Sequence, residues 1–497
     1  MKWLLVLIYA CTSYAEDYVF PPNFQFGVAT ASYQVEGGWN ASGKGENIWD
    51  VLTHNRPELI YDQSNGDIAC DTYNKAIADV QLLKSLGVDF YRFSFSWSRI
   101  LPVGTSNKIN PDGIRYYNEL IDELLKNGIK PFATMFHWDL PQPLQEIGGW
   151  PNPVVADLFV DYANELFEHF GDRVKDWITF NEPAVFCGGG YEDGSKAPAY
   201  KGNGFGVYLC AHTVLRAHGK AYRVYESKYK ASQGGRVGIT LDTYWFEPGS
   251  DKPEDIEAAE ITIQMNFGWF AHPIYSKEGD YPSVMKERIA ENSAIEGFPR
   301  SRLPEFTPEE IEEIRGSSDF FGLNHYTTNK CTPLPAGWGI PPSQWTDIGT
   351  MCYYETNWEI GASSWLAVVP WGFRKLLVWI KNEYNNPEVI ITENGFSDKG
   401  ELNDCRRINY YNTYLEELLK AIHEDGCNIS GYTAWSFLDN FEWMRGFTEK
   451  FGVVYVDFDD PDRSRTPKMS YYVYKNILAT KRVDWKFTPD SFNECEF

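Results

Sequence analysis

The sequence predicts an α/β fold, namely a (β/α)8 TIM barrel built as a single domain. Eight runs rich in β-branched and aromatic residues alternate with stretches of helical periodicity. No linker rich in Pro, Gly and Ser interrupts the 497 residues, so one compact unit is the simplest organisation. An open doubly wound sheet is the alternative fold, and the number of strand–helix repeats favours the closed barrel.

The elements of this barrel can be placed in chain order. Apolar residues from Tyr73 to Leu86 recur every three or four positions, and Gly87 follows as a C-terminal stop. The same helical spacing recurs in residues 120–125, 376–380 and 471–478. The predicted strands span residues 24–32, 90–97, 130–138, 174–182, 236–244, 320–327, 389–395 and 429–439.

Residues 1–15 have the pattern of a secretory signal peptide. Lys2 precedes an apolar run, and Ser13-Tyr14-Ala15 supplies a small-x-small cleavage site. This run is too short to span a bilayer, and no later stretch reaches about 18 apolar residues, so no membrane partner is expected. We expect residues 16–497 to form the barrel domain of a secreted protein, in preference to one retained in the lumen of an acidic organelle.

Composition and motifs exclude several classes of function. Lys and Arg total 45 against 69 Asp and Glu, and the net charge of −24 repels the phosphates of nucleic acids. There is no C-x-x-C or H-E-x-x-H motif and the eight His do not cluster, so no metal site is expected. The sequence also lacks a dinucleotide fingerprint, a P-loop and a G-x-S-x-G elbow.

Secretion bears on the cysteines and on glycosylation. Of nine Cys, Cys11 leaves with the signal peptide. A chain of this length builds its core without disulfides, so one or two at most are expected. Sequons at Asn40 and Asn428 predict two glycosylation sites.

Polar and aromatic residues gather where the predicted strands end. In a (β/α)8 barrel the active site occupies the C-terminal ends of the strands. Six strands would bring side chains to this one face. Burying a carboxylate there costs free energy unless the carboxylate is paired or takes part in function. The residues concerned are Gln34, His137, Trp138, Asn181, Glu182, Asn324, His325, Tyr326, Glu393, Asn394 and Trp435.

Two of these residues are carboxylates that follow apolar runs. Glu182 closes the segment WITFNEP and Glu393 lies in VIITENG, so the two should face each other across the barrel mouth. Cleavage of a glycosidic bond requires such a pair, one acid to protonate the leaving oxygen and one carboxylate to attack or assist at the anomeric carbon. The structural alternative is a pair of rim glutamates bridged to Lys or Arg.

Six motifs together resemble glycoside hydrolase family 1, the β-glucosidase family of retaining enzymes on a (β/α)8 barrel. They are SYQVEGG, YRFSFSWSRI, HWDLPQ, TFNEP, ITENG and AWSFLDNFEW, and the resemblance covers about residues 23–475. It implies that Glu182 is the general acid/base and Glu393 the nucleophile, with Arg92 beside Glu393 and Tyr326 orienting it. No metal or organic cofactor is implied.

The resemblance also implies a sugar site. Arg92 would keep Glu393 ionised while Glu182 holds a proton, which is how two glutamates take opposite roles. Asn324 would support the acid, Trp435 would form the apolar floor and Trp365 would wall the leaving-group side. Phe186, Cys187, Trp338 and Trp358 are further candidates for that wall. Ring hydroxyls would be bound by Gln34, His137, Asn181, Glu442 and Trp443.

Three functions remain open at this point. The favoured one is a retaining β-glycosidase whose partner is a small-molecule β-D-glucoside, with galactosides or fucosides as further substrates. The alternative is an animal-type myrosinase, a thioglucosidase that keeps Glu182 and in which Lys196 or Lys201 meets a sulfate. A non-catalytic carbohydrate-binding relative is disfavoured because Glu182, Glu393 and Arg92 are all present. The oligomeric state is left open between a monomer and a homodimer.

Overall fold

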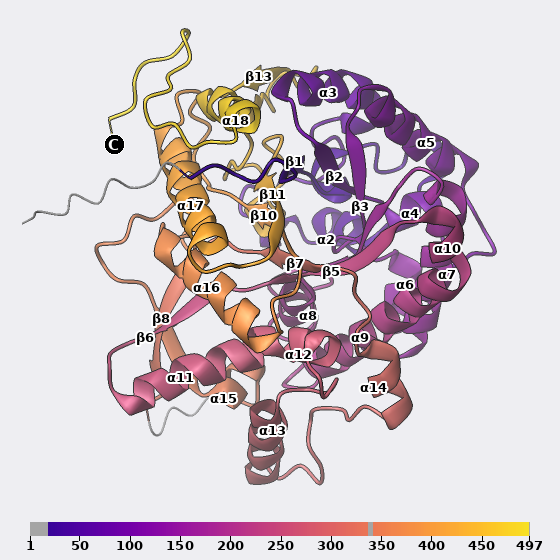
Figure 1. Cartoon of the computed structure of the whole chain (residues 1–497). Helices are drawn as coiled ribbons and strands as arrows, with labels where there is room; N and C mark the ends of the chain where they lie inside the picture. Colours follow the sequence, from indigo (N-terminus) through magenta and orange to yellow (C-terminus); the bar gives the residue numbers. More distant parts are fainter. Residues whose placement is uncertain (1–17, 336–340, 497) are drawn as a thin grey trace, which may run out of the picture.

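The computed structural model describes residues 18–335 and 341–496, and its centre is a closed barrel of eight parallel strands (Figure 1). The strands follow the order β1-β11-β10-β7-β5-β4-β3-β2 around the barrel. This confirms the predicted fold class. The barrel strands are β1 (Gln25–Ala29), β2 (Phe90–Ser94), β3 (Lys130–Phe136), β4 (Asp176–Asn181), β5 (Arg236–Asp242), β7 (Phe321–Asn324), β10 (Val389–Asn394) and β11 (Ile429–Trp435).

All eight predicted runs contain a barrel strand, but each strand ends one to four residues before the predicted end. Asn181, Asn324, Glu393 and Asn394 lie at the ends of their strands, whereas other predicted site residues lie in the segments that follow. Gln34, for example, lies in the short helix α1 (Ser32–Val35) that follows β1. The early ends therefore place the candidate site residues just above the barrel, where their side chains can converge.

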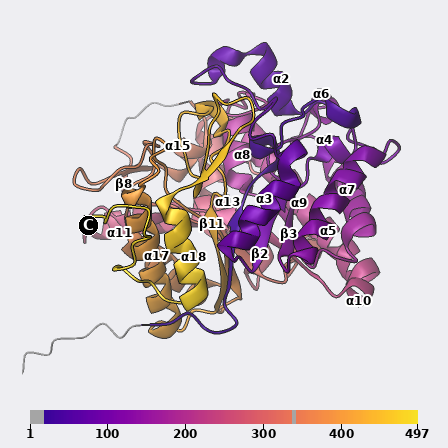
Figure 2. The same ribbon diagram turned by 90° about the horizontal axis from the view of Figure 1, so that it is seen from above.

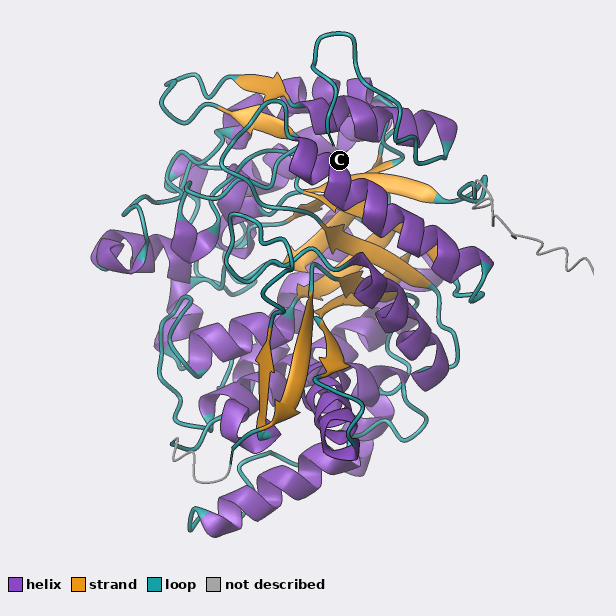
Figure 3. Ribbon diagram, turned by 90° about the vertical axis from the view of Figure 1, so that its left-hand side faces the viewer, coloured by secondary structure: helices purple, strands orange, loops and turns teal. Residues whose placement is uncertain are grey.

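Helices surround the strands, as Figure 3 shows with helices in purple around strands in orange. The predicted helical stretches lie in α3 (Thr72–Leu86), α5 (Pro111–Lys126), α16 (Pro370–Glu383) and α18 (Met469–Thr480). α3 ends at Gly87, whose φ of 87° is left-handed and whose N–H bonds the carbonyl of Leu83 at 3.0 Å. The other long helices include α7 (Val154–Phe170), α9 (Gly206–Val224) and α17 (Cys405–His423).

Loops after several strands carry additional structure at one end of the barrel. Figure 2 shows α2 (Ile48–Asn55) and α6 (Gln142–Glu146) at the end opposite the point where the chain enters the barrel. Three further strands, β6 (Trp245–Pro248), β8 (Thr328–Pro333) and β9 (Thr350–Tyr353), form a small sheet beyond β5 and β7. β12 (Val454–Val456) and β13 (Arg465–Pro467) pair as a second, antiparallel sheet.

Among the described residues, three disulfides link segments outside the barrel, so the expectation of one or two at most was wrong. Cys187–Cys210 joins α8 (Pro183–Tyr191) to α9, and Cys331–Cys352 joins β8 to β9. Cys405–Cys495 ties the start of α17 to the C-terminal segment. The argument from core size holds for the barrel, but loops and chain ends have little core of their own, and there a covalent link contributes most.

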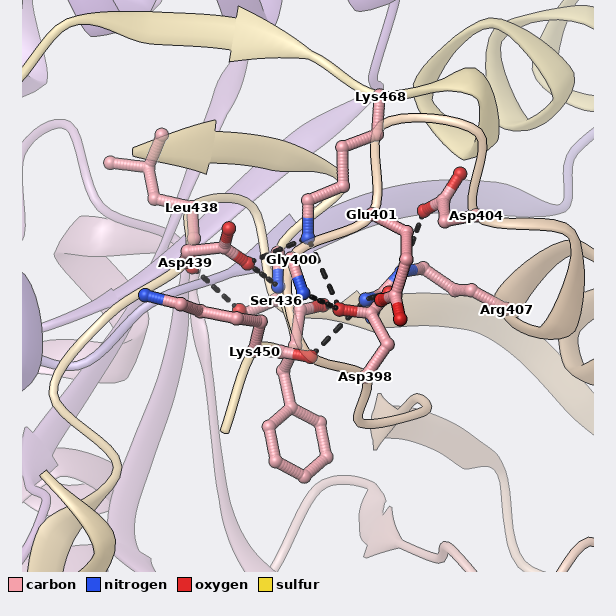
Figure 4. A network of polar contacts seen from close by, with 12 residues as sticks. Asp398, Gly400, Glu401, Asp404, Arg407, Ser436, Leu438, Asp439, Lys450 and Lys468 are labelled. Atoms are coloured by element: carbon pink, nitrogen blue, oxygen red, sulfur yellow. Dashed lines mark hydrogen bonds and ion pairs between the residues drawn. The ribbon is translucent and has the colours of Figure 1, made fainter. Parts of the chain in front are cut away.

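A buried network of charges fixes the loops that follow β10 and β11 (Figure 4). Arg407 pairs with Asp404, Nε to Oδ2 at 2.8 Å, and also with Asp398. Lys468 Nζ lies 2.9 Å from Asp439 Oδ1, and Asp439 Oδ1 accepts a hydrogen bond from the N–H of Gly452. Buried charges of this kind are stable only when paired. The network therefore holds the segment after β11 in a fixed position.

Within the described ranges 18–335 and 341–496, no helix is long and apolar enough to cross a membrane. The predicted signal peptide, residues 1–15, lies outside the described residues.

Candidate active site

Glu182 and Glu393 reach the same end of the barrel from strands β4 and β10. Glu393 is 3% exposed and lies within β10, whereas Glu182 is 8% exposed and directly follows β4. The backbone of Glu182 is left-handed, with φ 52°, as are those of Trp138 at 78° and Trp443 at 53°. Positive φ is uncommon for residues with side chains and concentrates at functional sites.

Glu393 is held by two donors. Arg92 Nη1 donates to Oε1 at 2.6 Å, and the Tyr326 hydroxyl donates to Oε2 at 2.7 Å. Burial raises the pKa of Glu393, and the charge of Arg92 is the largest influence in the opposite direction. Both carboxylate oxygens therefore have a fixed partner that favours the ionised form.

Glu182 has a different environment. Its Oε1 accepts one hydrogen bond, from Asn324 Nδ2 at 2.7 Å. Burial, followed by the negative charges of Asp242 and Glu393, raises the pKa of Glu182 well above its ordinary value. Asn324 is itself fixed by the hydroxyl of Thr392, which donates to its Oδ1 at 2.8 Å. The two glutamates thus differ: two negative charges add to the effect of burial on the pKa of Glu182, whereas Arg92 and Tyr326 oppose the effect of burial on the pKa of Glu393.

Asn181 connects the two glutamates to His137. Its Oδ1 accepts from Arg92 Nη2 at 2.5 Å and from Asn324 Nδ2 at 3.2 Å. Its Nδ2 lies 3.1 Å from His137 Nε2. Burial and the charge of Arg92 lower the pKa of His137 well below its ordinary value, so the ring is neutral. With Nε2 accepting from the amide, Nδ1 of His137 carries the proton.

Three of the residues predicted to bind the sugar each have a buried polar atom with no protein partner. They are Oε1 of Gln34, Nδ1 of His137 and Oε1 of Glu442. Gln34 and Glu442 are neighbours, since Gln34 Nε2 donates to Oε2 of Glu442 at 3.4 Å. The His137 ring centre lies 5.9 Å from that of Trp435 and 6.0 Å from that of Trp443. An unpaired buried polar atom costs about 1–3 kcal/mol, so three beside two tryptophans indicate a site for a polar ligand.

A cavity of about 480 Å³ lies at this end of the barrel; Glu442 and Trp443 line it, whereas Gln34, His137 and Trp435 do not. Trp365 lines it, as the resemblance implied. The lining also includes residues that had no predicted role, notably Asp242, Tyr244 and Trp345. Among the predicted residues, the cavity is lined by Trp138, Glu182, Lys196, Asn324, Tyr326, Trp365, Glu442 and Trp443.

Some candidates for the leaving-group wall do not line this cavity. Phe186 is buried and packs against Phe136, with ring centres 5.1 Å apart, because this face of α8 turns toward the core. Cys187 is buried in a disulfide, which also removes it as a free thiol. Trp358 packs against Trp371 away from the cavity. Trp338 lies outside the described residues.

The sequence reasoning missed Asp242. This residue ends β5 and follows the apolar run Val237–Leu241, so the strand-end rule applied to six other strands would have found it. Burial raises the pKa of Asp242 to about 7, and the charge of Glu393 contributes in the same direction. Asp242 therefore adds a further carboxyl group to the end of the barrel that holds Glu182 and Glu393.

Other predicted residues have a simple outcome. Asn40 and Asn428 are both exposed, although Asn428 immediately precedes β11. Lys201 is exposed and does not line the cavity, unlike Lys196. His325 and Asn394 are fully buried and bond to the chain around them, so they support the site from behind. Over the described parts of the chain, no cluster of three His, Cys, Asp or Glu side chains is arranged to hold a metal ion.

The model of glycosyl hydrolase family 1 matches residues 16–483. The chain belongs to this family. Myrosinase 1 of Brevicoryne brassicae is 50% identical over 466 residues, which cover 93% of this chain and 99% of the relative. The cytosolic beta-glucosidase of Homo sapiens is 44% identical, with 94% of this chain and 99% of the relative covered.

Solved structures of family members agree with this fold. An aphid myrosinase superposes with a TM-score of 0.90 at 49% identity, and the match covers 94% of this chain and 100% of the myrosinase chain. A beta-glucosidase from the fungus Humicola insolens in complex with glucose has a TM-score of 0.87 at 39% identity, with 94% and 99% covered. The chain is therefore a glycoside hydrolase of a family of retaining β-glucosidases.

Proposed function

We propose that the protein hydrolyses β-D-glucosides by double displacement, with Glu182 as general acid/base and Glu393 as nucleophile. The contrast between the two carboxyl groups supports these roles. Glu393 accepts from Arg92 and Tyr326, while Glu182 has a strongly raised pKa and a single amide donor. An ionised nucleophile opposite a protonated acid is the starting state of a retaining glycosidase.

The reaction then follows from the charges. A Glu393 oxygen attacks the anomeric carbon as the bond to the leaving oxygen breaks, and Glu182 gives its proton to that oxygen. The glycosyl ester at Glu393 has no negative charge, which removes one cause of the raised pKa of Glu182. Glu182, now a carboxylate, takes a proton from the attacking water, and Glu393 leaves as a carboxylate.

The three unpartnered atoms carry the proposal that the ligand is a sugar. Gln34 Oε1 and Glu442 Oε1 would accept hydrogen bonds from sugar hydroxyls, and the N–H at His137 Nδ1 would donate one. Asn181 keeps one N–H for the 2-hydroxyl, a contact that strengthens in the transition state. Trp435 and Trp443 would cover the apolar faces of the ring.

Lys196 favours a second candidate, a thioglucosidase acting on glucosinolates. Its Nζ lies 5.1 Å from the Trp138 ring centre inside the cavity, and its stem lies against Gly189, where a Cβ would come within 2.7 Å of Lys196 Cγ. An ammonium at this place is able to meet an anionic group of the leaving portion. The relative from Brevicoryne brassicae is named a myrosinase.

A hydrolysis panel on the purified protein tests both candidates. It includes β-glucosides, β-galactosides, β-fucosides, cellobiose and one glucosinolate, each with the wild type and with Glu393→Ala. Cleavage of the O-glucosides that is lost in the variant is the expected result. Cleavage of the glucosinolate alone would favour the thioglucosidase, and no cleavage of any member would overturn the proposal.

We further propose that residues 16–497 act as one secreted catalytic domain after removal of residues 1–15, with glycans at Asn40 and Asn428. The exposure of both asparagines and the three disulfides support this. Expression in a secreting host followed by N-terminal sequencing and endoglycosidase digestion tests it. A retained leader or an unchanged mass after digestion would contradict it.

A further inference from the structure

Asp242 ends β5, which lies between β4, the strand that precedes the proposed acid Glu182, and β7, the strand that ends at Asn324. β5 pairs with β4 on one side and with β7 on the other, and Asp242 is in register with Asn324. The N–H of Glu182 donates to the carbonyl of Thr240, two residues before Asp242, at 3.0 Å. Asp242 and Glu182 line the same cavity, and Oδ1 of Asp242 is buried without a hydrogen-bond partner.

The unpartnered Oδ1 requires an explanation. Asn324 donates a hydrogen bond to Glu182, whereas Oδ1 of Asp242 is buried and has no hydrogen-bond partner. A neutral residue at this place would avoid the cost of burying a carboxyl group beside two others. What Asp242 adds to the site is therefore a titratable negative charge next to Glu182.

The surrounding charges determine which group ionises first. After burial, the charge of Asp242 is the largest influence that raises the pKa of Glu182, ahead of Glu393. Asp242 itself has its pKa raised to about 7 by burial and by Glu393, while Lys196 opposes the rise. The other groups that face the pair are Arg92 on β2, Tyr244 after β5, Tyr326 after β7 and, through Lys196, Asp193 and Glu442.

We propose that Asp242 is a positioning residue that loses its own proton before Glu182 and by its charge retains the proton on Glu182. This inference rests on the proposed acid role of Glu182. Two adjacent buried carboxyl groups do not ionise independently, so the first ionisation opposes the second. Asp242 thereby extends the pH range over which the acid can protonate a leaving group.

Asp242→Asn tests the inference, because it keeps the size of the side chain and removes the charge. The alkaline limb of the kcat/KM profile reports the ionisation of the acid in the free enzyme. We expect its midpoint to fall by about one pH unit in the variant. At one pH unit above the wild-type midpoint, activity should then be about tenfold lower than in the wild type. The acid limb should not move, because Asp242 is already protonated there.

A matched control removes a negative charge from the same cavity that is not among the charges raising the pKa of Glu182. Asp193→Asn is suitable because Asp193 is exposed and acts on Lys196. Its alkaline limb should keep the wild-type midpoint. If Asp242→Asn does not fold, Asp242→Ser removes the same charge with a smaller side chain. An alkaline limb that is unmoved in the folded Asp242 variant, or that shifts equally in Asp193→Asn, would overturn the inference.

Covalent labelling distinguishes this failure from failure of the proposed function. An activated 2-fluoroglucoside is applied to the wild type and to Asp242→Asn. Label on Glu393 in both proteins with an unmoved alkaline limb rejects only the role of Asp242. No label on Glu393 in the wild type rejects the proposed function itself. A 13C NMR titration of Asp carboxyl groups adds a readout independent of activity. Burial raises the pKa of both Asp242 and Asp139 to about 7, so the wild type should show two Asp signals that titrate near neutral pH, and Asp242→Asn should keep only that of Asp139.

Discussion

Removal of the Tyr326 hydroxyl provides a quantitative test of how Glu393 is kept ionised. Tyr326→Phe deletes the donor that lies 2.7 Å from Oε2 and keeps the ring, which packs edge-on against Trp365 with ring centres 5.6 Å apart. A hydrogen bond to a charged group contributes about 1.5–3 kcal/mol. At about 1.4 kcal/mol per tenfold change, kcat/KM should fall roughly 10- to 100-fold.

The same change has a defined sign in the pH profile. The bond from Tyr326 lowers the pKa of Glu393, so its loss raises that pKa. Glu393 must be ionised to attack, and the acid limb of kcat/KM should therefore move to higher pH, by about one unit because Arg92 remains in place.

The assay is the pH dependence of kcat/KM with an aryl β-glucoside for the wild type and Tyr326→Phe. Tyr244→Phe is the matched control, since it removes a phenolic hydroxyl from the same cavity without contact to Glu393. Its acid limb should stay where it is in the wild type. A Tyr326→Phe enzyme whose acid limb is unmoved, or moves to lower pH, would refute the reasoning.

Two further predictions concern the leaving-group side. Glu182→Gln should reduce kcat/KM for alkyl glucosides far more than for nitrophenyl glucosides, because only the former need a proton on the leaving oxygen. Steady-state kinetics with both classes of substrate test this, and equal losses of kcat/KM would contradict it. Lys196→Met removes the ammonium group from the cavity and keeps a stem of similar length. It should lower kcat/KM for an anionic glucosinolate at least tenfold relative to that for a neutral glucoside. An unchanged ratio of the two kcat/KM values would exclude the contact.

The barrel was predictable because its signal is local. Each buried strand is an apolar run, each helix repeats its apolar face, and residues such as Gly87 end helices through their backbone conformation. The strand-end rule then identified Glu182 and Glu393, which lie far apart in the sequence, without knowledge of their contacts.

The disulfide pairs, the orientation of Phe186 and the influence of Asp242 depend on which segments meet in space, and the sequence pattern does not show this. The partners of Cys331 and Cys405 are set by how loops fold over the barrel, and spacing alone does not reveal this. Phe186 turns inward because of the orientation of α8, which the motif around Glu182 does not encode. Asp242 ends a predicted strand and so falls under the same rule, but its influence on Glu182 depends on the pairing of β4 with β5 in the barrel.

Identification of the residue that becomes glycosylated tests the central claim most directly. The wild-type protein is treated with an activated 2-fluoro-β-D-glucoside, digested and sequenced by mass spectrometry. The account predicts a single stable adduct on Glu393, in the peptide that contains the segment Val389–Asn394, and none in Glu393→Gln. An adduct on any other residue, or turnover of the reagent with no adduct at all, would contradict it.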